Sequence, residues 1–258
     1  MDILALIEPV KTIAVAAAVF VPIERIAAVR PNQQILRRGV RADFVTGVVN
    51  TWLVYALLLV LLSAIDAAAE RAVPGLRALV RAAPLYVQIT VAIAVGDLGV
   101  YAVHRLEHTV PALWRFHVVH HAAEEMDWLV AVRHHPVDLF LLRLGSLGPL
   151  AALNVSATAF AAFVIVFGWQ SWLAHANVRL WYGPLRRLFV SPDFHHWHHS
   201  ADRAAHDKNF ASLLACWDVM FGTLHLPDAR PTRYGVDEAV PWSWSGRMLH
   251  PFHRTAPR

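Results

Sequence analysis

The chain has 258 residues, of which 57% are hydrophobic and only 16% are charged, and its mean hydropathy is +0.42. Soluble domains carry about a quarter charged residues, so this composition excludes an ordinary soluble protein and predicts a membrane protein. The single cysteine, Cys216, excludes an internal disulfide and a cysteine-based zinc or iron–sulfur site. The net charge of +4 does not indicate nucleic-acid binding, because the basic residues are scattered arginines beside apolar segments.

Three apolar segments precede the histidine-rich part of the chain. The first, residues 4–23, is a candidate transmembrane helix, with a signal peptide as the alternative; it lacks a positive start and a small-residue cleavage site. An arginine-rich loop, 24–43, follows. Residues 44–65 carry no charge. This run, which ends at Ile65, exceeds the roughly 20 helical residues that a bilayer core requires. A short charged loop then leads to the third predicted span.

The third span, residues 82–103, is interrupted only by Gly96 and Asp97 and runs directly into the first histidines. One stripe of this helix carries Asp97, Tyr101, His104 and His108, at steps of four, three and four residues. An acid inside a membrane segment is costly and indicates a functional site. We therefore consider Asp97 a partner of nearby metal ligands, with helix capping or pairing with an arginine as equal alternatives.

Histidines are the most informative residues of this sequence. There are 16 of them, and most fall into three groups: His104-Arg-Leu-Glu-His108, His117-Val-Val-His120-His121 and His195-His196-Trp-His198-His199. Residues i, i+3 and i+4 share one face of a helix, so each group is expected to present its imidazoles together. Neutral imidazole is a common ligand of iron, zinc and copper. Eight or more converging rings exceed what one ion accepts, so the pattern predicts two metals.

An uncharged stretch, 144–174, is too long for one untilted helix and short for two full spans. Gly145, Gly148, Pro149 and Asn154 lie within it, so we predict a helical hairpin beginning at about residue 139. Only an even number of membrane crossings between His121 and His195 returns the third histidine group to the side that holds the first two. If that side is cytoplasmic, the arginine-rich loop satisfies the positive-inside rule.

The remaining residues, 177–258, are mixed polar and aromatic, and prolines divide them into short elements. We expect them to form a cap over the metals. Because the histidine groups extend from 104 to 199, cutting the chain would divide the site, and we predict one domain: N-terminal membrane helices at 1–95, the histidine-motif region at 96–225 and a tail at 226–258. No GxGxxG loop or P-loop is found.

The order of these motifs resembles the fatty acid hydroxylase and sterol desaturase superfamily. The resemblance covers about residues 95–223. It rests on the segment from Asp97 to His108, on Trp114-Arg-Phe-His117-Val-Val-His120-His121, on His175-Ala-Asn177 and on Phe194-His195-His196-Trp-His198-His199-Ser200. Asn209-Phe210, Trp217-Asp218 and Phe221-Gly222-Thr223 are also similar to that family.

The resemblance implies an all-α, membrane-embedded fold and a cytoplasmic non-haem di-iron centre held by eight to ten histidines. The apolar segments described above would supply about three transmembrane helices plus the hairpin. The ligands and catalytic residues that it implies are His104, His108, His117, His120, His121, His175, His195, His198 and His199. Some members have another histidine four residues after the one at 175, where this chain has Arg179, so His135 is the candidate tenth ligand; the alternative is a loop histidine before a proline. His196 is expected to point away. His134, His206, His225, His250 and His253 are expected at the surface.

The implied function is O2-dependent hydroxylation of a membrane lipid, with desaturation by the same centre as the alternative. Two irons suit this chemistry, although zinc can occupy imidazole sites. Electrons must come from an external donor, a reductase with a ferredoxin or cytochrome b5-like carrier, because the chain has no nucleotide motif. A zinc metallopeptidase is disfavoured because HExxH is absent. A metal transporter is disfavoured because the histidines lie at and beyond the ends of the predicted spans.

Neutral imidazoles leave a metal centre strongly positive, so neighbouring carboxylates are expected to orient the rings and offset charge. The candidates near the motifs are Asp97, Glu107, Glu124, Asp127, Asp138, Asp193 and Asp218, each of which has a solvated or capping role as its alternative. Arg105 and Arg133 are considered for a lipid head group, with a plain membrane-surface role favoured.

Overall fold

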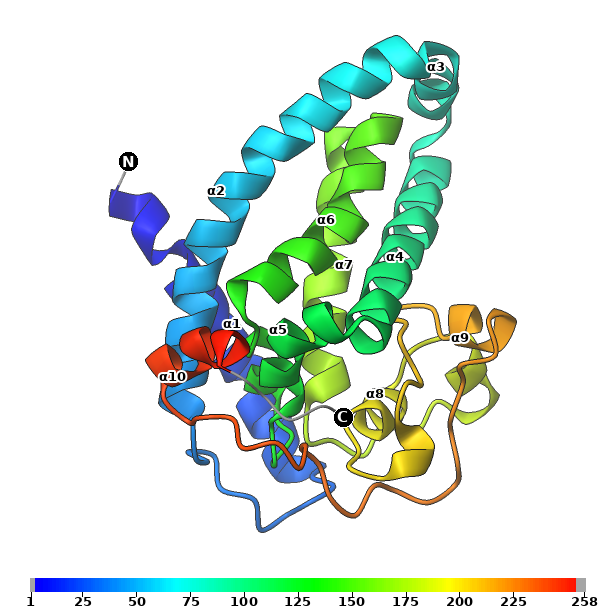
Figure 1. Cartoon of the computed structure of the whole chain (residues 1–258). Helices are drawn as coiled ribbons and strands as arrows, with labels where there is room; N and C mark the ends of the chain where they lie inside the picture. Colours follow the sequence, from blue (N-terminus) through cyan, green and yellow to red (C-terminus); the bar gives the residue numbers. More distant parts are fainter. Residues whose placement is uncertain (1–2, 254–258) are drawn as a thin grey trace.

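The computed structural model describes residues 3–253, and its helices form a tall bundle above a broader base (Figure 1). The long helices are α1 (Ile3–Ile26), α2 (Val40–Ala72), α4 (Leu85–Thr109), α6 (Pro136–Leu153) and α7 (Ala157–His175), joined by the shorter α3 (Pro74–Ala82) and α5 (Pro111–His121). The base contains η1 (Trp128–Val132), η2 (Gly183–Arg187), α8 (Pro192–His198), η3 (Arg203–Ala205), α9 (Cys216–Met220), α10 (Trp244–Leu249) and η4 (His250–Phe252). Apart from two isolated β-bridges, the described residues contain no β-structure, which confirms the predicted all-α class.

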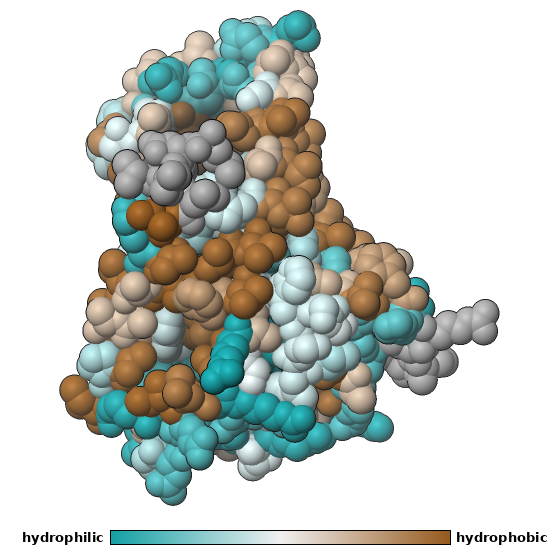
Figure 2. All heavy atoms as spheres, turned by 90° about the vertical axis from the view of Figure 1, so that its left-hand side faces the viewer, coloured by the Kyte–Doolittle hydropathy of each residue, from teal (hydrophilic) through white to brown (hydrophobic). Residues whose placement is uncertain are grey.

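Four helices, α2, α4, α6 and α7, are long and apolar enough to cross a membrane. Two of them carry the predicted spans at 44–65 and 82–103, and the other two form the predicted hairpin. Large apolar side chains on α2 face outward, such as Leu59 and Val60, which are 70% and 73% exposed. Figure 2 shows a wide apolar zone between two hydrophilic ends of the molecule. The fold is therefore that of an integral membrane protein.

The predicted first span is helical as α1, but α1 is not among the four helices found in the described residues. It carries Glu8, Lys11, Glu24 and Arg25. Glu24 is buried, and its Oε1 accepts the backbone N–H groups of Trp128 and Asn177, at 2.8 and 2.9 Å. The end of α1 is thus hydrogen-bonded to the base of the protein.

The two helices of the predicted hairpin are separated by a single break, at residues 154–156. Asn154 adopts the left-handed conformation, with φ of 54°, and ends α6, whereas the predicted breakers Gly145, Gly148 and Pro149 lie inside that helix. The Ser156 hydroxyl then accepts the N–H of Ala159 and begins α7. The short charged loop expected after residue 65 is also largely helical, because α2 continues to Ala72 and α3 follows it.

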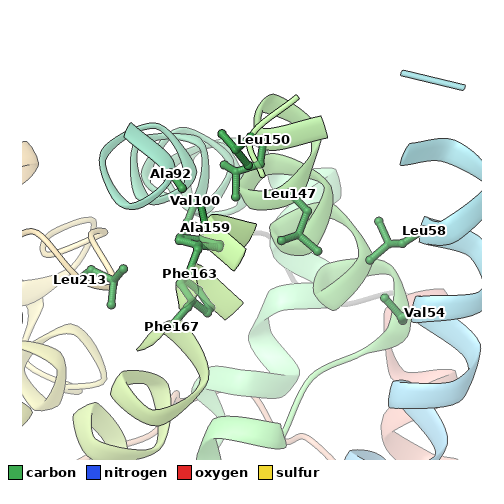
Figure 3. Close-up of a cluster of buried hydrophobic side chains, with 11 residues drawn as sticks. Val54, Leu58, Ala92, Val100, Leu147, Leu150, Ala159, Phe163, Phe167 and Leu213 are labelled. Carbon is green, nitrogen blue, oxygen red and sulfur yellow. The ribbon is translucent and has the colours of Figure 1, made fainter. Parts of the chain in front are cut away.

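The core between the spanning helices is made of aliphatic and aromatic side chains. Val54 and Leu58 of α2, Val100 of α4, Leu150 of α6 and Phe163 of α7 belong to one buried cluster (Figure 3). The α4 and α6 backbones cross very closely: a Cβ added at Gly99 would lie 1.9 Å from the Gly145 carbonyl oxygen. This crossing requires glycine and fixes the position of α4, which carries the first two histidines.

Candidate metal centre

The first histidine pair is brought against the second group by a proline. Val110 precedes Pro111 and is extended, so α4 ends at Thr109 and α5 begins at Pro111. The chain turns there, and α5 packs back against α4. His104 and His108 of α4 consequently face the imidazoles of α5, with Nε2 of His104 3.1 Å from Nε2 of His117.

The remaining histidines come from the end of α7 and from α8. His175 is the last residue of α7, which continues as an extended chain at Ala176. A serine, Ser191, caps α8 by accepting the N–H of Phe194, and Pro192 occupies its first turn. This short helix carries His195 and His198, and His199 follows at its C-terminal cap.

The structure gathers nine histidines into two buried groups that could each hold a metal ion. The five-histidine group consists of His104, His108, His117, His121 and His198; the four-histidine group consists of His120, His175, His195 and His199. Within each group the nearest ring nitrogens of all members lie within 4.8 Å of one another. This partition differs from the expectation that the histidines of one motif act together. The motifs of α5 and α8 each supply histidines to both groups.

In α5 and α8 the i, i+4 pair enters one group and the i+3 residue enters the other. His117 and His121 belong to the five-histidine group, whereas His120 belongs to the other. The opposite holds for α8, because His195 and His199 join the four-histidine group and His198 joins the first. Residues i and i+4 are 40° apart around a helix of 3.6 residues per turn, and i+3 lies on the other side of the stripe. The same two helices therefore contribute histidines to both groups, from the two sides of one helical stripe.

Hydrogen bonds outside each group determine which ring nitrogen points inward. The Nδ1 atoms of His104, His120, His175 and His198 donate to backbone carbonyls, those of Phe210, Arg133, Ser171 and Lys208, at 2.7–3.1 Å. A carbonyl oxygen can only accept, so Nδ1 carries the proton and the Nε2 lone pair of each neutral ring is directed into the group. The Nδ1 of His117 donates in the same way to Asp138 Oδ1 at 3.1 Å.

The inward nitrogens fit transition-metal ions. Six pairs of Nε2 atoms lie 2.9–3.2 Å apart. Ligands about 2.0–2.1 Å from a shared ion are separated by about 2.9–3.4 Å for octahedral to tetrahedral angles. The Nε2 atom of His198 is buried and has no hydrogen-bond partner. Lone pairs that converge in this way repel each other unless a cation lies between them, so the donor set suits metal binding.

Burial keeps these imidazoles neutral. Loss of hydration is the largest cause that lowers the pKa of His120, His121, His195 and His199 well below its ordinary value, and the nearby imidazoles are the next. Burial also lowers the pKa of His198 to about 3. At neutral pH these five rings are in the form that binds metals.

Two histidines outside the groups lie differently from what the sequence predicts. His135, the candidate tenth ligand, is not brought to either group: its Nδ1 accepts the N–H of Val137 at the start of α6, and its Nε2 lies 3.3 Å from the Met248 carbonyl oxygen. His134, expected at the surface, is buried and stacks on His120 with ring centroids 4.2 Å apart. Its Nδ1 donates to Asp138 at 2.7 Å, and the spacing of four residues between His134 and Asp138 is the sequence feature that could have indicated its burial.

The other histidines predicted at the surface differ in burial. His250 is buried and donates to Glu238, so that expectation was wrong for it, whereas His206 and His253 are exposed. His225 is half-buried. His196 points away from both groups as expected, because its Nδ1 contacts the Tyr234 hydroxyl at 2.9 Å.

The carboxylates also have distinct positions. Asp138 and Glu107 lie beside His117, with Glu107 Oε2 3.6 Å from its Nδ1. Asp97 accepts three backbone N–H groups, from residues 212–214, and Asp218 accepts those of Phe210 and Ala211. These last two acids fix the loop whose Phe210 carbonyl orients His104. The other candidates lie farther out: Asp127 pairs with Arg37, Asp193 lies 3.8 Å from Arg230, and Glu124 is exposed.

Arg133 has neither of the roles considered for it, a lipid head-group contact or a place on the membrane surface. It is 1% exposed and donates to Asp43 at 2.9 and 3.2 Å. Arg37 and Arg247 bind the same carboxylate. Since the Arg133 carbonyl orients His120, this buried ion cluster supports the four-histidine group. Arg105 donates to the Tyr101 hydroxyl at 3.2 Å.

Comparison with known proteins identifies relatives over the region that carries both groups. Residues 89–223 match the family model described as fatty acid hydroxylase. The chain is 34% identical over 174 residues to ornithine lipid hydroxylase OlsE of Rhizobium tropici, covering 66% of this chain and 52% of that protein. It is 32% identical over 145 residues to alkylglycerol monooxygenase of Danio rerio, and the match covers 56% of this chain and 32% of that protein.

A third relative, a very-long-chain aldehyde decarbonylase of Oryza sativa subsp. indica, is 27% identical over 171 residues and covers 61% of this chain and 26% of its own length. The chain thus spans about half of the first relative and a third or less of the other two. No solved structure matches it.

Proposed function

Because the chain belongs to the fatty acid hydroxylase family, we propose that it is an integral-membrane, non-haem di-iron oxidoreductase that uses O2 to hydroxylate a lipid at an unactivated C–H bond. The observation that carries this proposal is the pair of buried histidine groups, five and four imidazoles, whose nitrogens converge on two separate points. Nine neutral ligands and two centres match the needs of two iron ions, which when bound supply the O2 activation that no protein side chain provides.

The overall reaction needs two electrons from outside the chain. A lipid C–H bond, O2, two electrons and two protons give a C–OH bond and one water molecule. The sequence has no flavin or nicotinamide motif, so we expect an external reductase with a ferredoxin or a cytochrome b5-like carrier to supply the electrons.

The protein's own residues hold and orient the ligands and keep bulk water out. All nine candidate ligands are buried, and the outward Nδ1 bonds fix five of the rings. His104 and His108 lie in the last turns of α4, and His175 ends α7, so both groups lie at the ends of spanning helices. A lipid can therefore reach them while its apolar chain stays in the bilayer.

Hydroxylation is favoured over desaturation by the names of the relatives with the higher identities, a hydroxylase and a monooxygenase. A cytoplasmic location of the site is supported by the segment at 27–39. It contains Arg30, Arg37 and Arg38 and lies at the same end of the molecule as α8 (Figure 1).

The test is turnover by the purified full chain, loaded with iron and supplied with a reductase, a carrier and a membrane lipid extract. We expect a mass gain of one oxygen that derives from ¹⁸O2 gas and not from labelled water. Product oxygen that derives from water would overturn the monooxygenase proposal. Loss of two hydrogens without oxygen gain would identify a desaturase with the same centre. Iron and zinc contents, measured in the same preparation, determine which metal supports turnover.

A further inference from the structure

A large cavity of about 930 Å³ lies beside the five-histidine group. Its wall includes His108, His121 and His198, three members of that group, and none of the four-histidine group. This volume lies within the 300–1,000 Å³ that ligand sites usually occupy. The cavity therefore gives a ligand access to one of the two groups and not to the other.

Most of the cavity wall comes from two loop segments, residues 200–207 and 233–239. Figure 1 shows both segments at the end of the molecule opposite α3. Of the four spanning helices, only α4 contributes, through His108. Trp114 is the one large aromatic side chain in the wall. An alkyl chain alone would find few apolar partners here.

The charged side chains of the wall are of both signs. They are Arg203, Asp207, Arg233, Asp237 and Glu238. Arg233 pairs with Asp237 at 3.1 Å, and Glu238 accepts from His250 at 2.9 Å. Among the residues that the structure describes, no carboxylate forms an ion pair with Arg203, so its guanidinium is available to an anionic group. Asp207 Oδ1 lies 3.4 Å from Nδ1 of His108, so all three carboxylates have partners within the protein. By charge alone, the three carboxylates of the wall exceed its two guanidinium groups, which favours a cationic group nearby.

We propose that this cavity binds the head group of a lipid that carries both an anionic and a cationic group, and that the hydroxylated carbon lies in that head group or within a few bonds of it. This inference rests on the proposed function. A head group held among these charges touches the imidazoles directly, while the apolar chain must return to the bilayer that surrounds α2 and α4. Only carbons near the head group then reach the five-histidine group.

The experiment measures lipid retention without turnover. The iron-loaded full chain in dodecyl maltoside is kept free of O2 and reductant, and is incubated with four lipids of identical acyl chains whose heads are zwitterionic, anionic, cationic or uncharged. Co-purified lipid is measured by mass spectrometry. We expect the zwitterionic lipid to be retained most. Arg203→Glu and Asp237→Lys should each lower its retention about tenfold, as loss of one charge-assisted contact predicts.

A matched control is Arg186→Glu. Arg186, unlike Arg203, has a carboxylate partner, Asp228, and it does not line the cavity. It should leave retention unchanged, and the iron content of all three variants should equal that of the wild type, which shows that the fold and both histidine groups are intact.

Equal retention of the uncharged lipid, or no effect of Arg203→Glu, would overturn the head-group proposal. The same preparations, given O2 and electrons, separate this result from failure of the proposed function. Product formation without head-group selectivity leaves the hydroxylase intact, whereas selective retention without any oxidised product defeats the hydroxylase and leaves the binding site. Fragmentation of the product locates the new oxygen, and a position in the distal part of the chain contradicts the proposed carbon.

Discussion

Asp138 accepts a hydrogen bond from Nδ1 of His134 at 2.7 Å. Its other carboxylate oxygen accepts one from His117 at 3.1 Å. The His134 ring lies nearly parallel to that of His120, with an interplanar angle of 11°. A single buried carboxylate thus orients an imidazole of the five-histidine group directly and one of the four-histidine group through a stacked ring.

Replacement of Asp138 by asparagine should weaken metal binding. An amide presents N–H on one side, so it cannot accept hydrogen bonds from both imidazoles as the carboxylate does. Loss of such an orienting partner typically lowers metal affinity 10–100-fold. Iron retained during titration with a chelator measures the effect. Asp193→Asn, which alters a weak contact at 3.8 Å to Arg230, is the control; equal retention by the two variants would contradict the orienting role.

Metal stoichiometry tests the division of the histidines into two groups. The wild-type chain should bind about two transition-metal ions, because each group provides enough imidazoles for one. His199→Ala leaves the four-histidine group with three imidazoles and should reduce the content toward one, whereas His121→Ala leaves four imidazoles in the other group and should reduce the content less. His253→Ala, an exposed histidine outside both groups, should retain two. A wild-type value near zero or one in carefully metallated protein would refute the dinuclear site.

The buried ion cluster around Asp43 should contribute strongly to stability. Asp43 is fully buried and pairs with Arg37, Arg133 and Arg247. Asp43→Asn leaves buried guanidinium groups without compensation, which costs about 3–5 kcal/mol. Asp66→Asn removes a half-exposed partner of Arg77 and should cost at most about 1 kcal/mol. Thermal unfolding in detergent measures both, and a similar small effect of the two substitutions would argue against the cluster's structural importance.

The α4–α6 crossing predicts a sharp difference between two glycines. Gly99→Ala places a methyl group 1.9 Å from the Gly145 carbonyl oxygen, so the two helices must separate. Gly168 also lies in a helix, but nothing lies within 4 Å of its added Cβ. Gly168→Ala should be neutral or stabilise by about 0.5–1 kcal/mol. Unfolding temperatures and iron content measured together should fall only for Gly99→Ala; parallel behaviour of both variants would contradict the close crossing.

Membrane topology is testable with single cysteines in a Cys216→Ser background. The exposed positions Gln34, Glu124 and Ala204 lie at the histidine end, and Val73 lies between α2 and α3 at the other end. Cysteines at the first three should react with an impermeant reagent from the cytoplasmic side, and one at 73 from the opposite side. Labelling of 124 and 204 from different sides would contradict the α6–α7 hairpin.

Much of this protein was predictable from local sequence. The spans at 44–65 and 82–103 and the hairpin were found because hydrophobic length is a property of a continuous segment. The nine histidines that the structure gathers were all named, because metal-binding residue types at helical spacing are also local features. The extra turns of α2 were missed, and of the predicted breakers in 144–174 only Asn154 ends a helix, since charge and glycine do not end a helix that neighbouring helices support.

The pairing of the imidazoles was decided only by the tertiary structure. The sequence places His117, His120 and His121 on one helical stripe, but it does not state which neighbour each ring meets. That depends on how α4, α5 and α8 pack, and the close approach of Gly99 to Gly145 fixes the position of α4. The same long-range packing leaves His135 at the start of α6 and stacks His134 on His120. Spacing along a helix sets the direction of a side chain, whereas its partners depend on segments far apart in the chain.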